Sequence, residues 1–537
     1  KMDILGVRNL TVIEDAVAMI RQRHQADFDI DTISIEDEAT YDHLCEGRGV
    51  GVFQLESRGM RQLMKDMKPR VFEDIIALLA LYRPGPLGSG MVNDFVSNKL
   101  GKTEVKYPID ALEGILKETY GMIVYQEQVM QIASIIGGFS LGQADMLRRA
   151  MGKKKKDVMD VMREDFLQGA KEKGFNAKKA ENVFDLCYKF AEYGFNKSHS
   201  TAYALISFQT GYLKANFTVE YMSALLSSVV SNSDKTSIYI QECKEIGVDV
   251  LAPNVNESLR DYTIVMSEDA TKESIRFGLG AIKNVGDGAI ESIIEHRPFK
   301  DLADFCMKVD LRQCNKRVIE SLIKSGAMDL FGDRSYLLAV YEAAIESAQV
   351  LVKERSNGQV SLFSDDQAGV SVSMEAMDAA DYHVFNQQEM LRMEKDMLGL
   401  FISGHPLDSI KKRLDKAELS VSSLDSEKNG QFVTITGFVS NVRRIITKTK
   451  REMLSGTLED FTGSLSVLIF QNDQFDDYVS MFQDDHIITV TGRVRVNQDD
   501  VSITCQEMSV VDKGFDQKSY YIDADNMDLE LLETVKS

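Results

Sequence analysis

The sequence has no long apolar segment, no paired cysteines and no phosphate-loop motif. No run of about 18 uninterrupted apolar residues occurs in the chain, so we expect no membrane span. The six cysteines are scattered and form no CxxC pair. This pattern argues against a zinc site and a disulfide framework, and it is typical of a reducing cytoplasm. The absence of a GxxxxGK[ST] loop lowers the case for a nucleotide hydrolase of the P-loop class.

Chain length limits the expected number of domains, and net charge limits the classes of binding partner. A chain of 537 residues exceeds what one hydrophobic core organises, so we expect about three or four domains. The net charge of −21 argues against nucleic-acid binding, because phosphate repels an acidic surface. Residues 146–179 are a local exception, rich in Arg and Lys. A phosphate senses the local field within about 10 Å, so this stretch remains a candidate anion site.

Hydrophobic periodicity predicts a mostly helical chain that ends in strands. Helical spacing begins within residues 1–24 and dominates residues 53–230. The run Arg83-Pro84-Gly85-Pro86 is predicted to be non-helical, since both prolines lack an N–H and constrain the preceding residue. Residues 240–345 indicate short helices around Gly-rich turns. From 431 to 512 the period changes to two, which predicts several short strands and a small β-barrel.

A polar and acidic linker is expected at residues 355–380, followed by a helix at 386–400. The linker contains Gln359, Leu362 and Phe363. Exposed Leu and Phe side chains in such a stretch suit a partner's pocket, with Gln359 supplying hydrogen bonds. The alternative is a linker that folds back on its own domain.

Two segments have the chemistry of phosphate binding. Arg148, Arg149 and Lys153 lie beside a glycine, and guanidinium forks and ammonium groups suit phosphate oxygens. The alternative is a solvated basic helix end. Lys197 opens a predicted helix, where free N–H groups favour anions and Asn196, Ser198 and Ser200 are candidate caps. His199 alone is more often structural than catalytic.

The helix that follows Lys197 is predicted to have a polar face and an apolar face. The polar face comprises Ser200, Tyr203, Ser207, Thr210 and Lys214, at spacings of three and four. The residues expected to face a core are Leu205, Phe208 and Tyr212. This pattern is also that of an ordinary capped amphipathic helix.

Residues 285–288, with Gly286 and Gly288, resemble a helix-hairpin-helix turn preceded by Lys283. Glycines there expose backbone N–H groups to a DNA phosphate, and the next helix adds its N-terminal dipole. The alternative is a tight helical turn.

These motifs in this order resemble the alpha subunit of bacterial DNA polymerase III, the C-family replicative polymerase. The resemblance covers roughly residues 1–515, and its most specific segments are 1–8, 51–60, 82–86, 120–131, 145–154 and 193–200. It implies a multidomain α+β fold with a C-terminal OB-fold. The implied domains are 1–50 end of palm, 51–235 fingers, 236–350 helix-hairpin-helix region, 351–385 linker with a clamp-binding peptide, 386–430 helical connector, 431–515 OB-fold and 516–537 start of a truncated C-terminal region.

The resemblance also implies a site that binds two Mg²⁺ ions through three aspartates. It places the third aspartate at Asp3, with Lys1 as a neighbouring nucleotide-binding residue, and the other two before Lys1. The chain would then be a fragment that starts in the palm, and we expect it to be inactive alone because one carboxylate cannot hold two metal ions.

Further roles follow from the same resemblance. Arg148, Arg149, Lys153, Lys197 and His199 would bind the incoming nucleotide. DNA would contact Arg83, Lys283, Gly286 and Gly288, and the sliding clamp would bind Gln359, Leu362 and Phe363. The implied partners are dNTPs, primer–template DNA, the sliding clamp, a proofreading exonuclease and the clamp-loader tau subunit, without a membrane. The barrel would meet single-stranded template, although Glu452 interrupts the family's basic stretch.

The predicted function is template-directed nucleotidyl transfer by a replicative DNA polymerase. The alternative is a non-catalytic DNA-binding scaffold with a hairpin, an OB-fold and a clamp peptide. The scaffold explains residues 275–515 equally well, but it does not explain the dense motifs at 51–200.

Overall fold

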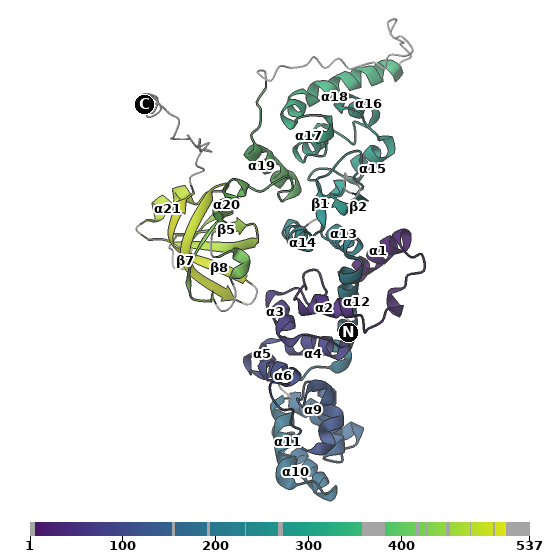
Figure 1. The fold of residues 1–537 in the computed structure, drawn as a ribbon, viewed down its shortest axis with the longest axis vertical. Helices are drawn as coiled ribbons and strands as arrows, with labels where there is room; N and C mark the ends of the chain where they lie inside the picture. Colours follow the sequence, from purple (N-terminus) through teal and green to yellow (C-terminus); the bar gives the residue numbers. More distant parts are fainter. Residues whose placement is uncertain are drawn as a thin grey trace, which may run out of the picture. The chain divides into compact units, whose positions relative to one another are not determined.

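The computed structural model forms two compact units, Lys1–Ser403 and Gly404–Ser537. Figure 1 traces the elements along the chain. The described residues are 6–152, 156–190, 194–230, 232–266, 272–356, 382–414, 419–424, 428–446, 452–472, 474–497 and 500–511.

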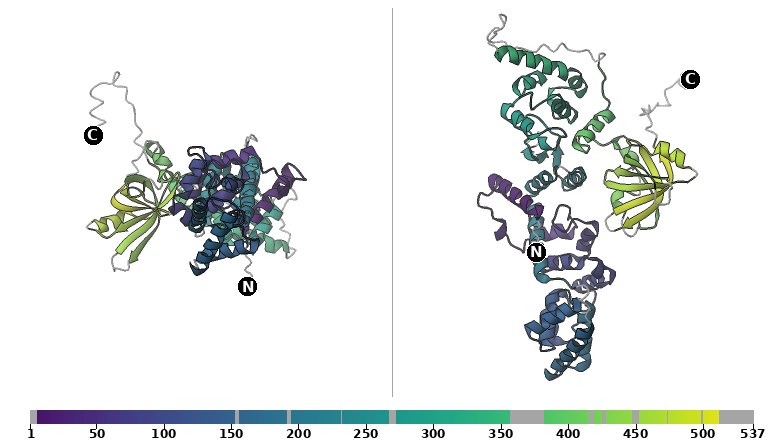
Figure 2. Two further views of the ribbon diagram at one scale, coloured as in Figure 1. Left: turned by 90° about the horizontal axis from the view of Figure 1, so that it is seen from below. Right: turned by 180° about the vertical axis from the view of Figure 1, so that it is seen from behind.

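Helix α12 (Lys197–Asn216) is the central element of the first half of the first unit, and it packs against four other helices (Figure 1, Figure 2). These are α1 (Arg8–Arg23), α2 (Glu38–Cys45), α4 (Phe72–Leu81) and α13 (Thr218–Ser228). The shorter neighbours are α3 (Arg58–Met67), α5 (Pro84–Gly88) and α6 (Met91–Lys99). Apolar side chains from α2, α3, α4 and α12 share one core, which fixes the direction of α12.

A second core organises the helices between α6 and α12. Its elements are α7 (Glu113–Leu116), α8 (Gln126–Ile135), α9 (Leu141–Gly152), α10 (Lys156–Glu172) and α11 (Ala177–Phe190). Gly169 in α10 lies directly against the backbone of Gly137, after α8, and a Cβ at Gly169 would overlap the Gly137 carbonyl. Two segments therefore cross closely at this point, which residues without a side chain permit.

The second half of the first unit combines a small sheet with helices. The strands are β1 (Asp249–Leu251), β2 (Thr263–Met266) and β3 (Glu273–Arg276), in the order β1-β3-β2. The helices are α14 (Ser233–Glu245), α15 (Asp287–His296), α16 (Leu302–Lys308), α17 (Lys316–Lys324), α18 (Arg334–Ser356) and α19 (Gln387–Leu398). Sequence analysis did not predict the sheet, because strands of three and four residues are too short for a period of two to be recognised.

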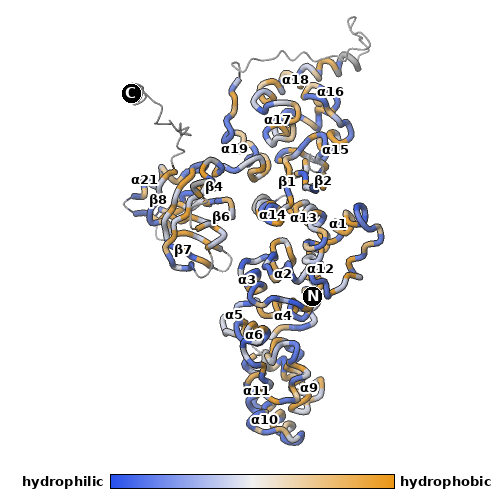
Figure 3. The backbone as a smooth tube through the Cα atoms, viewed as in Figure 1, coloured by the Kyte–Doolittle hydropathy of each residue, from blue (hydrophilic) through white to orange (hydrophobic). Residues whose placement is uncertain are grey.

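The second unit contains a closed barrel in the order β4-β5-β6-β8-β7. Its elements are β4 (Phe432–Ile446), β5 (Glu452–Asp460), β6 (Gly463–Phe470), α21 (Phe475–Met481), β7 (Ile487–Asn497) and β8 (Asp500–Val510). Leu465, Val467 and Ile469 of β6 point into the core, and the intervening residues are more exposed. Figure 3 shows hydrophobic and hydrophilic positions interleaved along these strands. Helix α20 (Lys411–Leu414) precedes the barrel.

Short 3₁₀ turns connect several of these elements. They are η1 (Ile30–Thr32), η2 (Asp110–Leu112), η3 (Lys117–Thr119), η4 (Leu279–Ala281), η5 (Asp329–Phe331), η7 (Asp408–Ile410) and η8 (Val421–Ser423).

The predicted fold class is confirmed: helical regions come first and a five-stranded barrel follows. One local prediction is wrong. Pro84 is the first residue of helix α5, although the run from Arg83 was predicted to be non-helical. The prolines lie in the first turn, where N–H groups have no intrahelical acceptor, so the missing donors cost nothing there. Among the described residues, no helix combines the length and the apolar character needed to cross a membrane.

Candidate phosphate-binding site at the start of α12

The first turn of α12 is capped by Asn196. The Asn196 side chain accepts a hydrogen bond from the His199 N–H at 2.8 Å, which confirms one of the three candidate caps. Ser198 and Ser200 lie inside the helix instead. The Thr201 hydroxyl donates to the Lys197 carbonyl at 2.8 Å. Helix starts of this kind favour negative charge, because their N–H groups lack intrahelical partners and the helix dipole is positive there.

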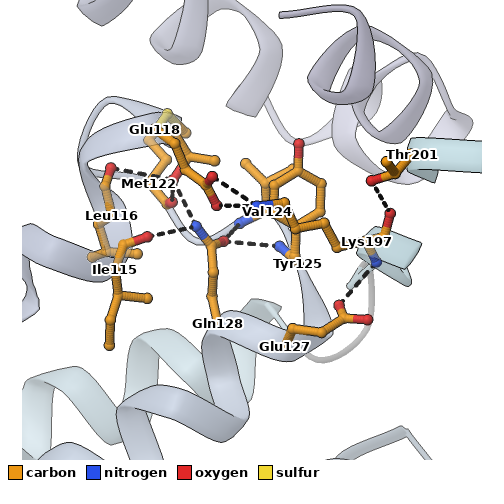
Figure 4. A network of polar contacts seen from close by, with 11 residues as sticks. Ile115, Leu116, Glu118, Met122, Val124, Tyr125, Glu127, Gln128, Lys197 and Thr201 are labelled. Carbon is orange, nitrogen blue, oxygen red and sulfur yellow. Dashed lines mark hydrogen bonds and ion pairs between the residues drawn. The ribbon is translucent and has the colours of Figure 1, made fainter. Parts of the chain in front are cut away.

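Two carboxylates of this chain already occupy that positive region (Figure 4). Glu127 of α8 accepts from the Lys197 backbone N–H and from the Asn196 amide, both at 2.9 Å. Glu118 of η3 accepts from the Lys197 ammonium through both oxygens, at 2.8 and 2.7 Å. The ammonium also lies 5.5 Å from the centre of the Tyr125 ring. The helix start is thus neutralised from within the protein.

Gln128 positions the segment that carries Glu118 (Figure 4). Its side chain is only 2% exposed. Its carbonyl oxygen accepts from the backbone N–H groups of Val124 and Tyr125, at 2.8 and 3.0 Å. Its amide donates to the Ile115 carbonyl and the Thr119 hydroxyl, at 3.2 and 2.8 Å. A buried amide with all these partners fixes the backbone on both sides of η3.

Arg148 is joined to the same region through Gln126. The Arg148 guanidinium donates to the side-chain amide oxygen of Gln126 at 3.1 Å. Gln126 in turn donates from its side chain to the Gly194 carbonyl at 3.0 Å and from its backbone to Phe195 at 2.9 Å. Arg148 and Arg149 also share Asp145, one turn earlier in α9, at 2.7 and 2.8 Å. Hydrogen bonds from Arg148 lower the pKa of Asp145, so it remains an acceptor for both guanidinium groups.

Arg83 contacts the site through the Phe195 ring. Its guanidinium lies 4.3 Å from the centre of the Phe195 ring, which is a cation–π distance. Burial lowers the pKa of Arg83. The Phe195 ring precedes α12 and lies 5.7 Å from the His199 ring, which lies 4.4 Å from the Tyr203 ring one turn further along the helix. The structure therefore gathers Arg83, Arg148 and Lys197, which are far apart in sequence, around residues 194–199.

The predicted polar face of α12 is mostly buried, and three of its side chains bind the backbone of the loop before α3. The Ser207 hydroxyl donates to the Phe53 carbonyl at 2.9 Å, and the Thr210 hydroxyl accepts from the Phe53 N–H at 3.1 Å. Lys214 donates to the Val50 carbonyl at 2.7 Å.

Leu205, predicted to face a core, is instead 42% exposed, whereas Phe208 is fully buried. The expected apolar set is thus wrong at Leu205. The loop before α3 supplies polar backbone groups, and these turn the Ser207 and Thr210 face of α12 inward.

The predicted hairpin contacts lie in a different part of the first unit. Gly286 caps α15, and a Cβ at Gly288 would come within 2.5 Å of the Gln313 side chain. Lys283 donates from its backbone to the Met397 carbonyl at 3.0 Å. Asp287 pairs with Arg260 at 2.9 Å. Gly288 thus permits a close approach between segments, and α15 begins directly after Gly286.

Comparison with known proteins finds similarity along most of the chain. Residues 9–174 match the model of the bacterial DNA polymerase III alpha subunit finger domain. Residues 247–337 match a helix-hairpin-helix motif, and residues 433–511 match an OB-fold nucleic acid binding domain. Over most of its length, the chain is similar to the bacterial DNA polymerase III alpha subunit. The finger match begins inside the segment assigned to the palm, so the boundary at residue 50 stays a prediction.

Relatives named DNA polymerase III subunit alpha align with most of the chain. The Campylobacter jejuni protein is 42% identical over 482 residues, which are 88% of this chain and 40% of that protein. The Borreliella burgdorferi protein is 40% identical, over 100% of this chain and 47% of its own length. The Escherichia coli protein is 39% identical, over 96% of this chain and 45% of its own length. The chain therefore spans less than half the length of these relatives.

The sequence patterns did not predict the side chains that position the cations of this site. Gln126, Glu127 and Gln128 lie in the motif at 120–131, but no role was predicted for them or for Glu118. A glutamine in the first turn of α8, three residues after Tyr125, is a capping pattern and could have predicted the role of Gln128. No local pattern could have paired Glu118 with Lys197, which is 79 residues away.

Several predicted site residues fall outside the described residues: Lys1, Asp3, Lys153, Gln359, Leu362 and Phe363. Within the part of the chain that the structure describes, no group of three His, Cys, Asp or Glu side chains could hold a metal ion. The expected Mg²⁺ site includes Asp3, which lies outside the described residues, so this site stays a prediction.

Proposed function

We propose that this chain is the part of a replicative DNA-directed DNA polymerase that holds the phosphates of the incoming nucleotide beside the primer–template. Similarity to the alpha subunit supports the reaction class. The observation that carries the assignment is the gathering of Arg83, Arg148 and Lys197 around residues 194–199 through Phe195, Gln126 and Glu127. The cations come from separate elements and are held by defined contacts, as a preorganised anion site requires.

These residues act on the charge of the nucleotide. In nucleotidyl transfer the primer 3′-hydroxyl attacks the innermost phosphorus, and pyrophosphate leaves with added negative charge. The Arg148 guanidinium is a fork for two phosphate oxygens, and the Lys197 ammonium is a mobile point charge. Removal of one such cation costs about 2–4 kcal/mol of transition-state stabilisation. Mg²⁺ ions bound by Asp3 and other carboxylates are the proposed cofactor, which supplies hydroxyl activation and leaving-group stabilisation.

The proposed partners follow from the family and from the two nucleic-acid-binding modules. Lys283 and the glycines at 286 and 288 would contact the backbone of primer–template DNA, and the barrel would contact single-stranded template. Gln359, Leu362 and Phe363 would dock on the sliding clamp. The exonuclease and the clamp-loader tau subunit are further proposed partners, and the cytoplasm is the proposed location.

Direct nucleotide binding tests the assignment. We expect Lys197→Gln and Arg148→Gln each to weaken binding of a fluorescent dATP by roughly ten-fold or more, because each removes a hydrogen bond to a charged group. Equilibrium titration of the 537-residue chain measures the affinity. Lys179→Gln, an exposed lysine on α11, is the matched control and should bind as the unaltered chain does.

The opposite result favours the scaffold function. If both variants bind dATP as tightly as the control, these cations do not hold the nucleotide, and the chain then acts through its DNA-binding modules alone.

A further inference from the structure

The carboxylates around α12 differ in how firmly they are held. Glu127 is fixed by two uncharged donors, the Lys197 backbone N–H and the Asn196 amide. Glu118 contacts the Lys197 ammonium, and each of these two side chains is 33% exposed. An ion pair at this exposure gains little net stability, since water screens it and both side chains lose freedom. The Glu118–Lys197 pair is therefore the exchangeable one.

The backbone that carries Glu118 is nevertheless held firmly in place. Gln128, buried and fully hydrogen-bonded, fixes the backbone on both sides of η3. Tyr120, which follows η3, has a left-handed backbone with φ of 53°. Such a conformation is uncommon for a residue with a side chain, and its surroundings must hold it. A lysine that was only solvated would not need a carboxylate fixed beside it. The rigid backbone at η3 therefore keeps the Glu118 carboxylate next to the Lys197 ammonium.

The ion pairs of Asp145 are local, whereas the ion pair of Glu118 is a tertiary contact. It is paired with Arg148 and Arg149 at helical spacings of three and four, so the geometry of α9 alone accounts for it. The Glu118–Lys197 contact joins residues 79 apart in sequence and depends on tertiary structure.

We propose that Glu118 is an internal competitor for the phosphate site: its carboxylate holds the Lys197 ammonium until a polyphosphate anion takes its place. This inference rests on the proposed function of Lys197 as a phosphate ligand. When the anion leaves, Glu118 takes back the ammonium, so the pair lowers the affinity for every anion that uses Lys197, pyrophosphate included. No covalent bond is made or broken in this exchange.

Titration with inorganic tripolyphosphate tests the proposal. We expect Glu118→Gln to bind the probe roughly two- to five-fold more tightly than the unaltered chain, in line with the strength of an exposed ion pair. Isothermal calorimetry on the full chain measures the affinity. Glu113→Gln removes the same charge from an exposed position five residues earlier, and it should change binding much less.

A second pair of variants shows whether the effect acts through Lys197. In the Lys197→Gln background, Glu118→Gln should no longer tighten binding, because there is no ammonium to release. Glu118→Asp keeps the charge but shortens the reach, and it should tighten binding part of the way. Thermal melting of each variant shows whether it is folded, and Glu118→Asp replaces Glu118→Gln if the latter does not fold.

The outcomes separate the two proposals. If Lys197→Gln weakens binding and Glu118→Gln leaves it unchanged or weaker, the phosphate site stands and Glu118 merely orients the lysine, which overturns the competitor role. If Lys197→Gln binds tripolyphosphate as tightly as the unaltered chain, the phosphate role of Lys197 fails and the inference fails with it.

Discussion

Lys214 shows how α12 accommodates a fully buried charge. Its side chain has no exposed surface, and its ammonium donates to the Arg48 and Val50 carbonyls and to the Glu242 carboxylate. Burial lowers the pKa of Lys214, and the Glu242 charge opposes that shift. One residue thus ties α12, α14 and the loop before α3 together, which holds the motif at 51–60 against the helix that carries Lys197.

Lys214→Met should lower the free energy of unfolding by about 3–5 kcal/mol, because removing one partner of a buried pair strands the other charge. Urea denaturation followed by circular dichroism measures the change. Lys244→Met, an exposed lysine on the same helix as Glu242, should change stability by less than about 0.5 kcal/mol. Equal effects of the two substitutions would show that Lys214 is not a structural anchor.

At the scale of elements, a charged cluster joins α1 to α13. Glu220 in the first turn of α13 is 3% exposed and accepts from the Arg23 guanidinium and the His24 ring, both at 2.8 Å. Arg23 also pairs with Glu273 of β3. Burial raises the pKa of Glu220, but hydrogen bonds from its own backbone N–H, His24 and Arg23 outweigh it, and the net pKa is lowered.

The stability contributed by Glu220 should therefore depend on pH. A carboxyl whose folded-state pKa is depressed stabilises the fold above its ordinary value of 4.5, and that contribution disappears as the pH falls through the lower folded-state value. We expect Glu220→Gln to cost about 1–3 kcal/mol at pH 7 and progressively less below pH 4.5. Urea midpoints measured between pH 3 and 7 follow this difference. Glu164→Gln, an exposed carboxylate on α10, should change the urea midpoint much less.

At the scale of the whole molecule, the two compact units have separate hydrophobic cores. The barrel core is formed by residues of the second unit, including Leu458, Val467 and Ile503. The largest core of the first unit includes Leu322 of α17. A domain with its own core can open without its neighbour.

Leu458→Ala should therefore destabilise the barrel by about 2–5 kcal/mol, through lost burial and a residual cavity. Hydrogen exchange followed by mass spectrometry should show faster exchange in β4 to β8 and unchanged exchange in α12 and α17. Leu322→Ala is the reciprocal variant and should speed exchange in the first unit only. Faster exchange in both units from either substitution would contradict independent cores.

Sequence reasoning predicted the features that depend on neighbouring residues. It found the helical spacing of α1, the cap at Asn196, the helix after the linker and the alternation of β4, β6 and β7. It missed β1 to β3, which are too short to show a period, and it misjudged Pro84, whose effect depends on its place within a helical turn. For the candidate site, it proposed the cations, whose role stays a prediction, and missed the acids and amides that contact them.

By itself the sequence determined the resemblance to the family and the order of helical and barrel regions, and it supplied candidate cations for phosphate binding. Only tertiary structure decided that Glu118 and Glu127 meet Lys197, that Arg83 lies over Phe195, and that the Ser207 and Thr210 face of α12 is buried. The physical reason is the separation in sequence between the residues that interact. Periodicity and capping act over a few residues and leave a local pattern, whereas these contacts join segments about 70 to 150 positions apart and follow from how separate helices pack around shared cores.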